Sequence, residues 1–125
     1  MPIGVERLKK RSDFLRVASV RRKWAAPGLV LQAACVPADQ NDGRVRVGFT
    51  VTKKVGNSVV RNRVKRRLRA VAQNLIPGNA VPGWDYVLIG RHTTIKRDFK
   101  DLQTDLLTAL NKVTLTQNKK NRSQS

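Results

Sequence analysis

The chain has 125 residues, enough for one domain of ordinary size, and 40% of them are hydrophobic. Lys and Arg number 26 against eight Asp and Glu, which gives a formal net charge of +18. Such a charge opposes compaction and indicates a polyanionic partner, either a nucleic acid or an anionic membrane surface. The sequence has neither the apolar run of roughly 18 residues that a membrane-spanning helix needs nor a signal-peptide core. One cysteine excludes an internal disulfide framework and fits a reducing cytosol. We therefore expect a cytoplasmic protein that binds nucleic acid.

The N-terminal part predicts a basic arm followed by a short helix. The residues up to about Arg11 form the arm, and Ser12 is the expected N-cap of a helix that ends near Val20. The apolar or small members of this helix are Phe14, Leu15, Val17 and Ala18.

Two extended segments and a loop follow. A short extended piece around Trp24 precedes an Ala-Pro-Gly turn signal at residues 26–28. The apolar run at residues 29–36 predicts a buried strand, in which Cys35 is expected to be a small core residue. A polar loop then ends in an Asp-Gly pair at residues 42–43, which is a hairpin signal.

The clearest strand lies at residues 44–52, where apolar and mostly polar side chains alternate as they do in a strand with one buried face. It leads into the basic loop KKVG at residues 53–56. Further along, two Pro and two Gly at residues 77–83 predict a loop, and the run WDYVLIG at residues 84–90 predicts another strand.

Between these strands lies a stretch, NSVVRNRVKRRLR at residues 57–69, with six Lys or Arg and no acidic residue. At about 100° per residue the apolar side chains of a helix here fall into one band, made by Val60, Val64, Leu68, Val71 and Leu75. The opposite face holds Asn62, Lys65, Arg66, Arg69 and Gln73, with Arg61 and Arg63 on its shoulders. Arg61, Lys65 and Arg69 form a row in which each adjacent pair costs an isolated helix roughly 0.2–0.5 kcal/mol. Phosphates that supply the missing negative charge explain this row better than a solvated face does.

The start of this helix supports the same interpretation. A Gly-Asn-Ser sequence at residues 56–58 offers an N-cap, and a helix N-terminus presents backbone N–H groups and a positive dipole end to an anion. Lys53 and Lys54 immediately precede it. We therefore expect the helix and the loop before it to bind phosphates of a nucleic acid.

The C-terminal part predicts a capped helix and a polar tail. Asp98 is the expected N-cap, and one apolar stripe runs through Phe99, Leu102, Leu106, Leu110 and Val113. Residues 1–115 are expected to form a single RNA-binding domain. Residues 116–125 are polar and basic, and we expect them to be disordered.

The chain lacks a credible set of catalytic side chains. His92 is the only histidine, which excludes cleavage by a histidine pair, and nothing near it indicates a nucleophile with its base. The carboxylates of Asp98, Asp101 and Asp105 are better explained as a cap and dipole-favoured acids on a solvated face than as a metal site. We expect no catalytic and no metal-binding residue, and we assign no role to His92 or Cys35.

The order of residues in the basic segment is more informative than their density. The run RVGFTVTKKVGNSVVRNRVKRRLR closely resembles the signature of the bacterial ribonuclease P protein subunit, in which an Arg-Asn-Arg helix follows a Lys-Lys-Val-Gly-Asn loop. The segments RLKKRSDFLRV, WDYVLIGR and DFKDLQTDLLTALNKV resemble the N-terminal helix, the last strand and the last helix of that family. The resemblance covers roughly residues 6–113.

The resemblance implies an α/β (α+β) two-layer sandwich of order α-β-β-β-α-β-α, similar to some ribosomal proteins, with a left-handed βαβ crossover through the basic helix. It implies a protein subunit of the ribonucleoprotein endonuclease that removes 5′ leaders from precursor tRNA. In that family the RNA subunit hydrolyses the phosphodiester with Mg²⁺, and the protein positions the leader. The alternative is a ribosomal or other structural RNA-binding protein, which the charge and size fit equally well.

The resemblance also implies two RNA-binding surfaces. The helix surface that faces the catalytic RNA and the start of the leader corresponds to Asn57, Arg61, Asn62, Arg63, Lys65, Arg66 and Arg69. A cleft between the first helix and the sheet holds the single-stranded leader, and its matching positions include Phe14, Trp24, Lys53 and Arg91. Aromatic and basic side chains suit such a cleft, because any base can stack and every nucleotide carries a phosphate. Ala18 and Gln32 stand where the family often has aromatic residues, so stacking is expected to depend on Phe14, together with Trp24.

Overall fold

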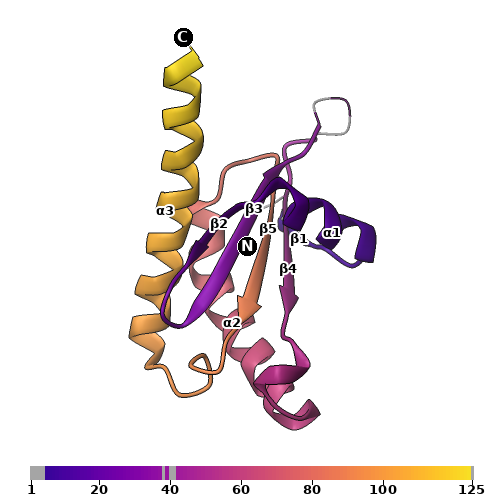
Figure 1. The fold of residues 1–125 in the computed structure, drawn as a ribbon, viewed down its shortest axis with the longest axis vertical. Coiled ribbons are helices and arrows are strands. Elements are labelled where there is room, and N and C mark those ends of the chain that lie inside the picture. The colour runs from indigo at the N-terminus through magenta and orange to yellow at the C-terminus, as the bar shows by residue number, and fades with distance from the viewer. Residues whose placement is uncertain (1–4, 38, 40–41, 125) are drawn as a thin grey trace.

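A five-stranded sheet with helices on both faces forms the molecule (Figure 1). The computed structural model describes residues 5–37, 39 and 42–124, and the side chains of residues 6–37, 39 and 42–114. In chain order the elements are β1 (Val5–Arg7), α1 (Arg11–Val20), β2 (Arg22–Ala25), β3 (Leu29–Cys35), β4 (Val45–Thr50), the 3₁₀ helix η2 (Lys53–Val55), α2 (Ser58–Asn79), β5 (Trp84–Gly90) and α3 (Phe99–Gln124). From α1 onward the helices and strands follow the predicted order α-β-β-β-α-β-α, which confirms the predicted α+β fold class. The prediction had two layers, whereas α1 covers part of the sheet face opposite α2 and α3.

The N-terminal arm differs from the expectation, because part of it belongs to the sheet. β1 pairs in parallel with β4, with Val5 opposite Val45 and Arg7 opposite Val47. A strand of three residues is too short to show a hydrophobic period, so the sequence pattern could not predict it.

The sheet has the strand order β1-β4-β5-β3-β2. β5 lies between β3 and β4, antiparallel to β3 and parallel to β4. The hairpin predicted at residues 42–43 is therefore wrong, because the two strands that this loop joins are not neighbours. The Asp-Gly pair indicates only a local reversal of the chain, and it cannot show that a later strand, β5, lies between the two strands that it joins. The hairpin of this region is instead β2–β3, at the predicted turn.

The main core lies between the sheet and the helices α2 and α3. Leu31, Tyr86 and Leu88 point from the central strands into this core, where Leu68 of α2 and Leu106 of α3 are equally buried. The predicted apolar faces of both helices are confirmed, since Val64, Leu68 and Val71 of α2 and Leu102, Leu106, Leu110 and Val113 of α3 are buried. α2 connects β4 to β5 and is the crossover that the resemblance describes as left-handed.

α2 packs closely against the end of β5. A Cβ atom at Gly90 would lie 2.4 Å from Cγ1 of Val64, so only glycine permits this approach of the helix to the sheet. This close packing fixes the distance between α2 and the sheet, and with it the position of the exposed side of the helix.

Several boundaries and side chains differ from the predictions. The N-cap of α1 is Lys10 rather than Ser12, because the helix begins two residues earlier and makes no side-chain cap. α2 includes Pro77 in its last turn and ends at Asn79, and the N–H of the C-cap residue Ala80 donates to the carbonyl of Ile76. Cys35 is exposed rather than in the core, because it occupies the last position of β3.

The C-terminal helix is longer than expected. Asp98 caps it as predicted, with its Oδ1 accepting a hydrogen bond of 3.2 Å from the N–H of Lys100. The backbone of α3 then continues to Gln124, whereas residues 116–125 were expected to be disordered. The segment contains neither Pro nor Gly, so nothing in it interrupts the helical backbone.

Candidate nucleic-acid interface

α2 begins at a side-chain cap. Oδ1 of Asn57 accepts a hydrogen bond of 3.0 Å from the N–H of Val60, as the Gly-Asn-Ser sequence predicts. η2, which contains the exposed Lys53 and Lys54, immediately precedes this cap. Two ammonium groups and a helix N-terminus therefore lie close together, an arrangement that favours an anion.

The solvent side of α2 is a continuous basic face. Asn57, Asn62, Arg63, Arg66 and Arg69 are exposed, whereas Arg61 and Lys65 are half-buried. We call the cations of this set, Arg61, Arg63, Lys65, Arg66 and Arg69, the basic face of α2. No ion pair among the described residues involves a side chain of α2, although five of the eight acidic residues pair with arginines elsewhere. The charge of this face is thus uncompensated within the described part of the chain.

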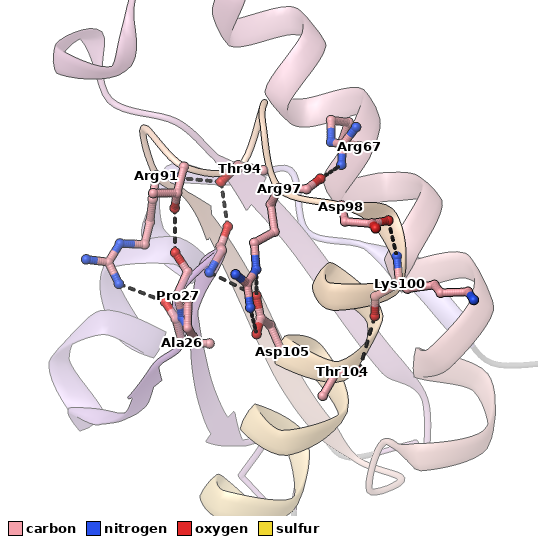
Figure 2. Close-up of polar contacts among 12 residues, drawn as sticks. Ala26, Pro27, Arg67, Arg91, Thr94, Arg97, Asp98, Lys100, Thr104 and Asp105 are labelled. Carbon is pink, nitrogen blue, oxygen red and sulfur yellow. Dashed lines mark hydrogen bonds and ion pairs between the residues drawn. The ribbon is translucent and has the colours of Figure 1, made fainter.

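Arg67 has a different role from its neighbours. It is half-buried, and its guanidinium donates a hydrogen bond to the backbone carbonyl of Arg97, in the segment that leads into α3 (Figure 2). This contact fixes α2 to the start of α3. The basic segment therefore contains one structural arginine next to the exposed Arg66.

The opposite face of the sheet is covered in part by α1. Val17 of α1 packs with Ala34 and Val87 in a small second core. Phe14 lies directly over Gly48 of β4, where an added Cβ would approach its ring carbons to 2.6 Å. This places Phe14 between α1 and the sheet, half-buried, in the position expected of a cleft residue.

A buried carboxylate that the sequence interpretation missed connects α1 to this face. Asp85 of β5 has no exposed surface and accepts hydrogen bonds of 2.8 and 2.7 Å from Nε and Nη2 of Arg46 on β4. Arg16 of α1 also binds Asp85, and Asp13 of α1 lies 3.9 Å from Arg46. The hydrogen bond to Asp85 raises the pKa of Arg46. The sequence did contain a signal of this ion pair, a single acid in an otherwise apolar strand, because a buried charge needs a partner.

Beside α1 the same face of the sheet remains partly open. Thr50, Ile89, Val30 and Ala25 are cross-strand neighbours on β4, β5, β3 and β2, and they form a row that we call the open strip. The first three are half-buried and Ala25 is exposed, whereas Gly48 and Val87 in the next row are buried. Four adjacent strands span about 14 Å at the usual spacing. The open strip therefore crosses most of the sheet.

Lys53 and Arg91 lie at one end of this face. They follow the parallel strands β4 and β5, so both lie at the carboxyl ends of these strands, which point to the bottom in Figure 1. Arg91 donates a hydrogen bond of 2.7 Å from Nη1 to the carbonyl of Ala26 (Figure 2). Thr94 donates to the carbonyl of Gly28 at 2.6 Å, which ties the loop after β5 to the β2–β3 turn. Arg91 is thus held beside that turn.

Trp24 is not in this cleft. It is the cross-strand neighbour of Leu31, a core residue, so its side chain points to the α3 side of the sheet while Phe14 lies on the α1 side. Nζ of Lys112 on α3 lies 5.4 Å from its ring centroid. The placement expected from the resemblance is therefore corrected: the side-chain face of a residue on this short strand depends on its register with β3. Gln32 points to the α1 side next to the open strip, and Ala18 is exposed on α1.

The acidic residues of α3 do not form a common site. Asp105 is buried rather than solvated, contrary to expectation: it binds Nε of Arg97 at 3.0 Å and accepts a hydrogen bond from the N–H of Gly28. The hydrogen bond to Asp105 raises the pKa of Arg97. Among the described residues no three His, Cys, Asp or Glu side chains converge as metal ligands. In the same part of the chain, no helix has the length and apolar character to cross a membrane.

Comparison with known proteins connects this geometry to a family. Residues 4–114 match the family described as Ribonuclease P. The chain belongs to the ribonuclease P protein family. Relatives named ribonuclease P protein component include that of Paramagnetospirillum magneticum, 57% identical over 116 residues, which cover 90% of this chain and 86% of the relative. The one from Ruegeria pomeroyi is 50% identical over 111 residues, covering 88% and 87%.

Solved structures of ribonuclease P proteins have the same fold. The protein from Staphylococcus aureus superposes with a TM-score of 0.67 at 27% identity, covering 84% of this chain and 92% of that one. The protein from Thermotoga maritima gives a TM-score of 0.67 at 25% identity, covering 82% and 92%. Membership confirms the chain as a protein component of ribonuclease P, an RNA-containing endoribonuclease that processes tRNA, rather than a ribosomal protein.

Proposed function

We propose that the protein divides its RNA contacts between the two sides of the sheet. The basic face of α2, with Asn57 and Asn62, binds the catalytic RNA near the start of the precursor-tRNA leader. The open strip, with Phe14 beside it over Gly48, Lys53 after its β4 end and Arg91 near its β2 end, binds the single-stranded 5′ leader. The observation that carries this proposal is the absence of any described ion pair on α2, while arginines elsewhere have carboxylate partners.

The chemistry belongs to the RNA subunit under this proposal. Asp85 and Asp105 are committed to arginines, Asp98 caps α3, and the described residues offer no convergent ligand set for a metal ion. Tyr86 is no general base either, because burial raises its pKa to about 12. Mg²⁺ is accordingly held mainly by RNA phosphate oxygens, ligands that this ion prefers. The protein acts in the cytoplasm by positioning RNA.

The test is cleavage of a precursor tRNA at low Mg²⁺ by a bacterial ribonuclease P RNA, with and without this protein. We expect stimulation only when both subunits are present, and no cleavage by the protein alone. Cleavage by the protein alone would place catalytic groups in the chain. Tight RNA binding without any stimulation would contradict a role in this reaction.

A further inference from the structure

Trp24 is an aromatic side chain that the two proposed RNA surfaces do not use. It is 38% exposed, the only aromatic residue among the exposed large apolar side chains of the described residues. Trp84, the other tryptophan, is 7% exposed and belongs to the core. Burial of apolar surface therefore accounts for Trp84 but leaves much of the Trp24 ring in water.

The position of Trp24 connects it to the open strip. Ala25, the next residue, is the last member of the strip, and β2 is the edge strand of the sheet. Because successive side chains of a strand point to opposite faces, a ligand that leaves the strip at Ala25 meets Trp24 after passing over one strand edge. Arg91 is anchored to the carbonyl of Ala26, so a guanidinium lies beside the same turn.

The charges along this edge favour a polyanion. Arg21, Lys23 and Trp24 are exposed on or next to β2, and Lys112 faces the Trp24 ring from α3. Between residues 102 and 114 the only acid is Asp105, which is buried and bound to Arg97. A second copy of this chain, also at +18, would bring like charge to the same edge. An RNA single strand brings phosphates for the cations and bases for the indole ring.

We propose that the precursor-tRNA leader does not end its protein contacts in the open strip but continues over the β2 edge, where Trp24 stacks on a base and Lys112 binds a neighbouring phosphate. The nucleotides concerned are those farther from the cleavage site, because the strip begins at the Lys53 end, near the N-terminus of α2. This inference rests on the proposed function of the strip.

The test measures the affinity of the reconstituted holoenzyme for one precursor tRNA with a graded series of leader lengths. For leaders long enough to pass the β2 edge, we expect Trp24→Ala to weaken binding by about tenfold, the effect of losing one base stack. Lys112→Ala should weaken the same substrates by a smaller factor. Short leaders should bind equally well to all variants. Lys100→Ala is the matched control, because it removes a lysine from the same helix about three turns away.

Two further measurements keep the result decisive. Trp24→Phe retains an aromatic ring and should recover most of the affinity. If Trp24→Ala and Trp24→Phe both unfold at the wild-type temperature, the affinity that Trp24→Ala loses cannot come from a destabilised fold. An equal loss for short and long leaders, or none for any leader, overturns the inference. If the wild-type holoenzyme itself shows no dependence on the leader, the proposed function of the strip fails instead.

Discussion

Asp85 is the residue on which the placement of α1 depends most. Its buried carboxylate binds Arg46 of β4 and Arg16 of α1, whereas the apolar contact of α1 with the sheet is a small cluster around Val17. We expect Asp85→Asn to lower the free energy of unfolding by roughly 3 kcal/mol, the low end for breaking a buried pair, because both arginines are about 30% exposed and can be hydrated. Urea denaturation measures this change.

The matched control for Asp85 is Asp13→Asn. Asp13 meets the same Arg46 at 3.9 Å but is itself partly exposed, so its loss should cost less than about 1 kcal/mol. Equal effects of the two variants would contradict the central role assigned to Asp85.

Gly48 and Phe14 form a pair whose coupling can be measured. A methyl group at Gly48 would meet the Phe14 ring at 2.6 Å, so Gly48→Ala must displace the ring and should cost about 1–3 kcal/mol. In a Phe14→Leu background the same substitution should cost less, because the clashing ring atoms are absent. A double-mutant cycle on unfolding free energies tests this expectation, and a coupling below about 0.5 kcal/mol would contradict it. We also expect Gly48→Ala to raise the KM for precursor tRNA, because Phe14 leaves the cleft.

At the scale of elements, two adjacent arginines of α2 have different roles, one in RNA binding and the other in the stability of the fold. Arg66 is exposed on the basic face, whereas Arg67 is half-buried and bound to the carbonyl of Arg97. We expect Arg66→Ala to weaken assembly with the catalytic RNA and to reduce the slope of log K against log salt by about one unit, with unchanged stability. Arg67→Ala should mainly lower the melting temperature of the free protein.

Filter binding over a range of salt concentrations, together with thermal unfolding of each variant, distinguishes the two arginines. The assignment is wrong if Arg67→Ala changes the salt slope as much as Arg66→Ala does. A lower melting temperature of Arg66→Ala would likewise contradict the placement of Arg66 on the exposed face.

The elements also show what sequence reasoning can and cannot reach. α2 and α3 were predictable because a helix shows its buried face as a local period, and the positions of Leu68 and Leu106 confirm it. The insertion of β5 between β3 and β4 was not, since pairing between strands depends on contacts distant in sequence. The same limit misplaced Trp24, whose face is set by its register with Leu31. Asp85 could be recognised as unusual, but neither of its arginine partners could be named from the sequence.

At the scale of the whole molecule, the distribution of charge is uneven. Glu6, Asp13, Asp42, Asp85 and Asp105 each pair with an arginine, so most of the acids are already used inside the fold. The surplus of cations is left for the surface, and the basic face of α2 is one part of it. The free protein therefore folds against its own repulsion, and an RNA partner relieves it.

This distribution predicts opposite effects of salt on the free protein and on the complex. Added NaCl screens repulsion among exposed cations, while the partly buried pairs of Asp85 and Asp105 are screened less, so the melting temperature of the free protein should rise with salt. RNA binding releases counterions, so the extra stabilisation by the RNA subunit should fall over the same range. Thermal unfolding with and without RNA in a NaCl series measures both trends. Replacing Arg63, Arg66 and Arg69 by Gln should reduce both the rise of the melting temperature of the free protein with salt and the loss of RNA stabilisation with salt. A melting temperature of the free protein that falls with salt would mean that its ion pairs outweigh its net repulsion.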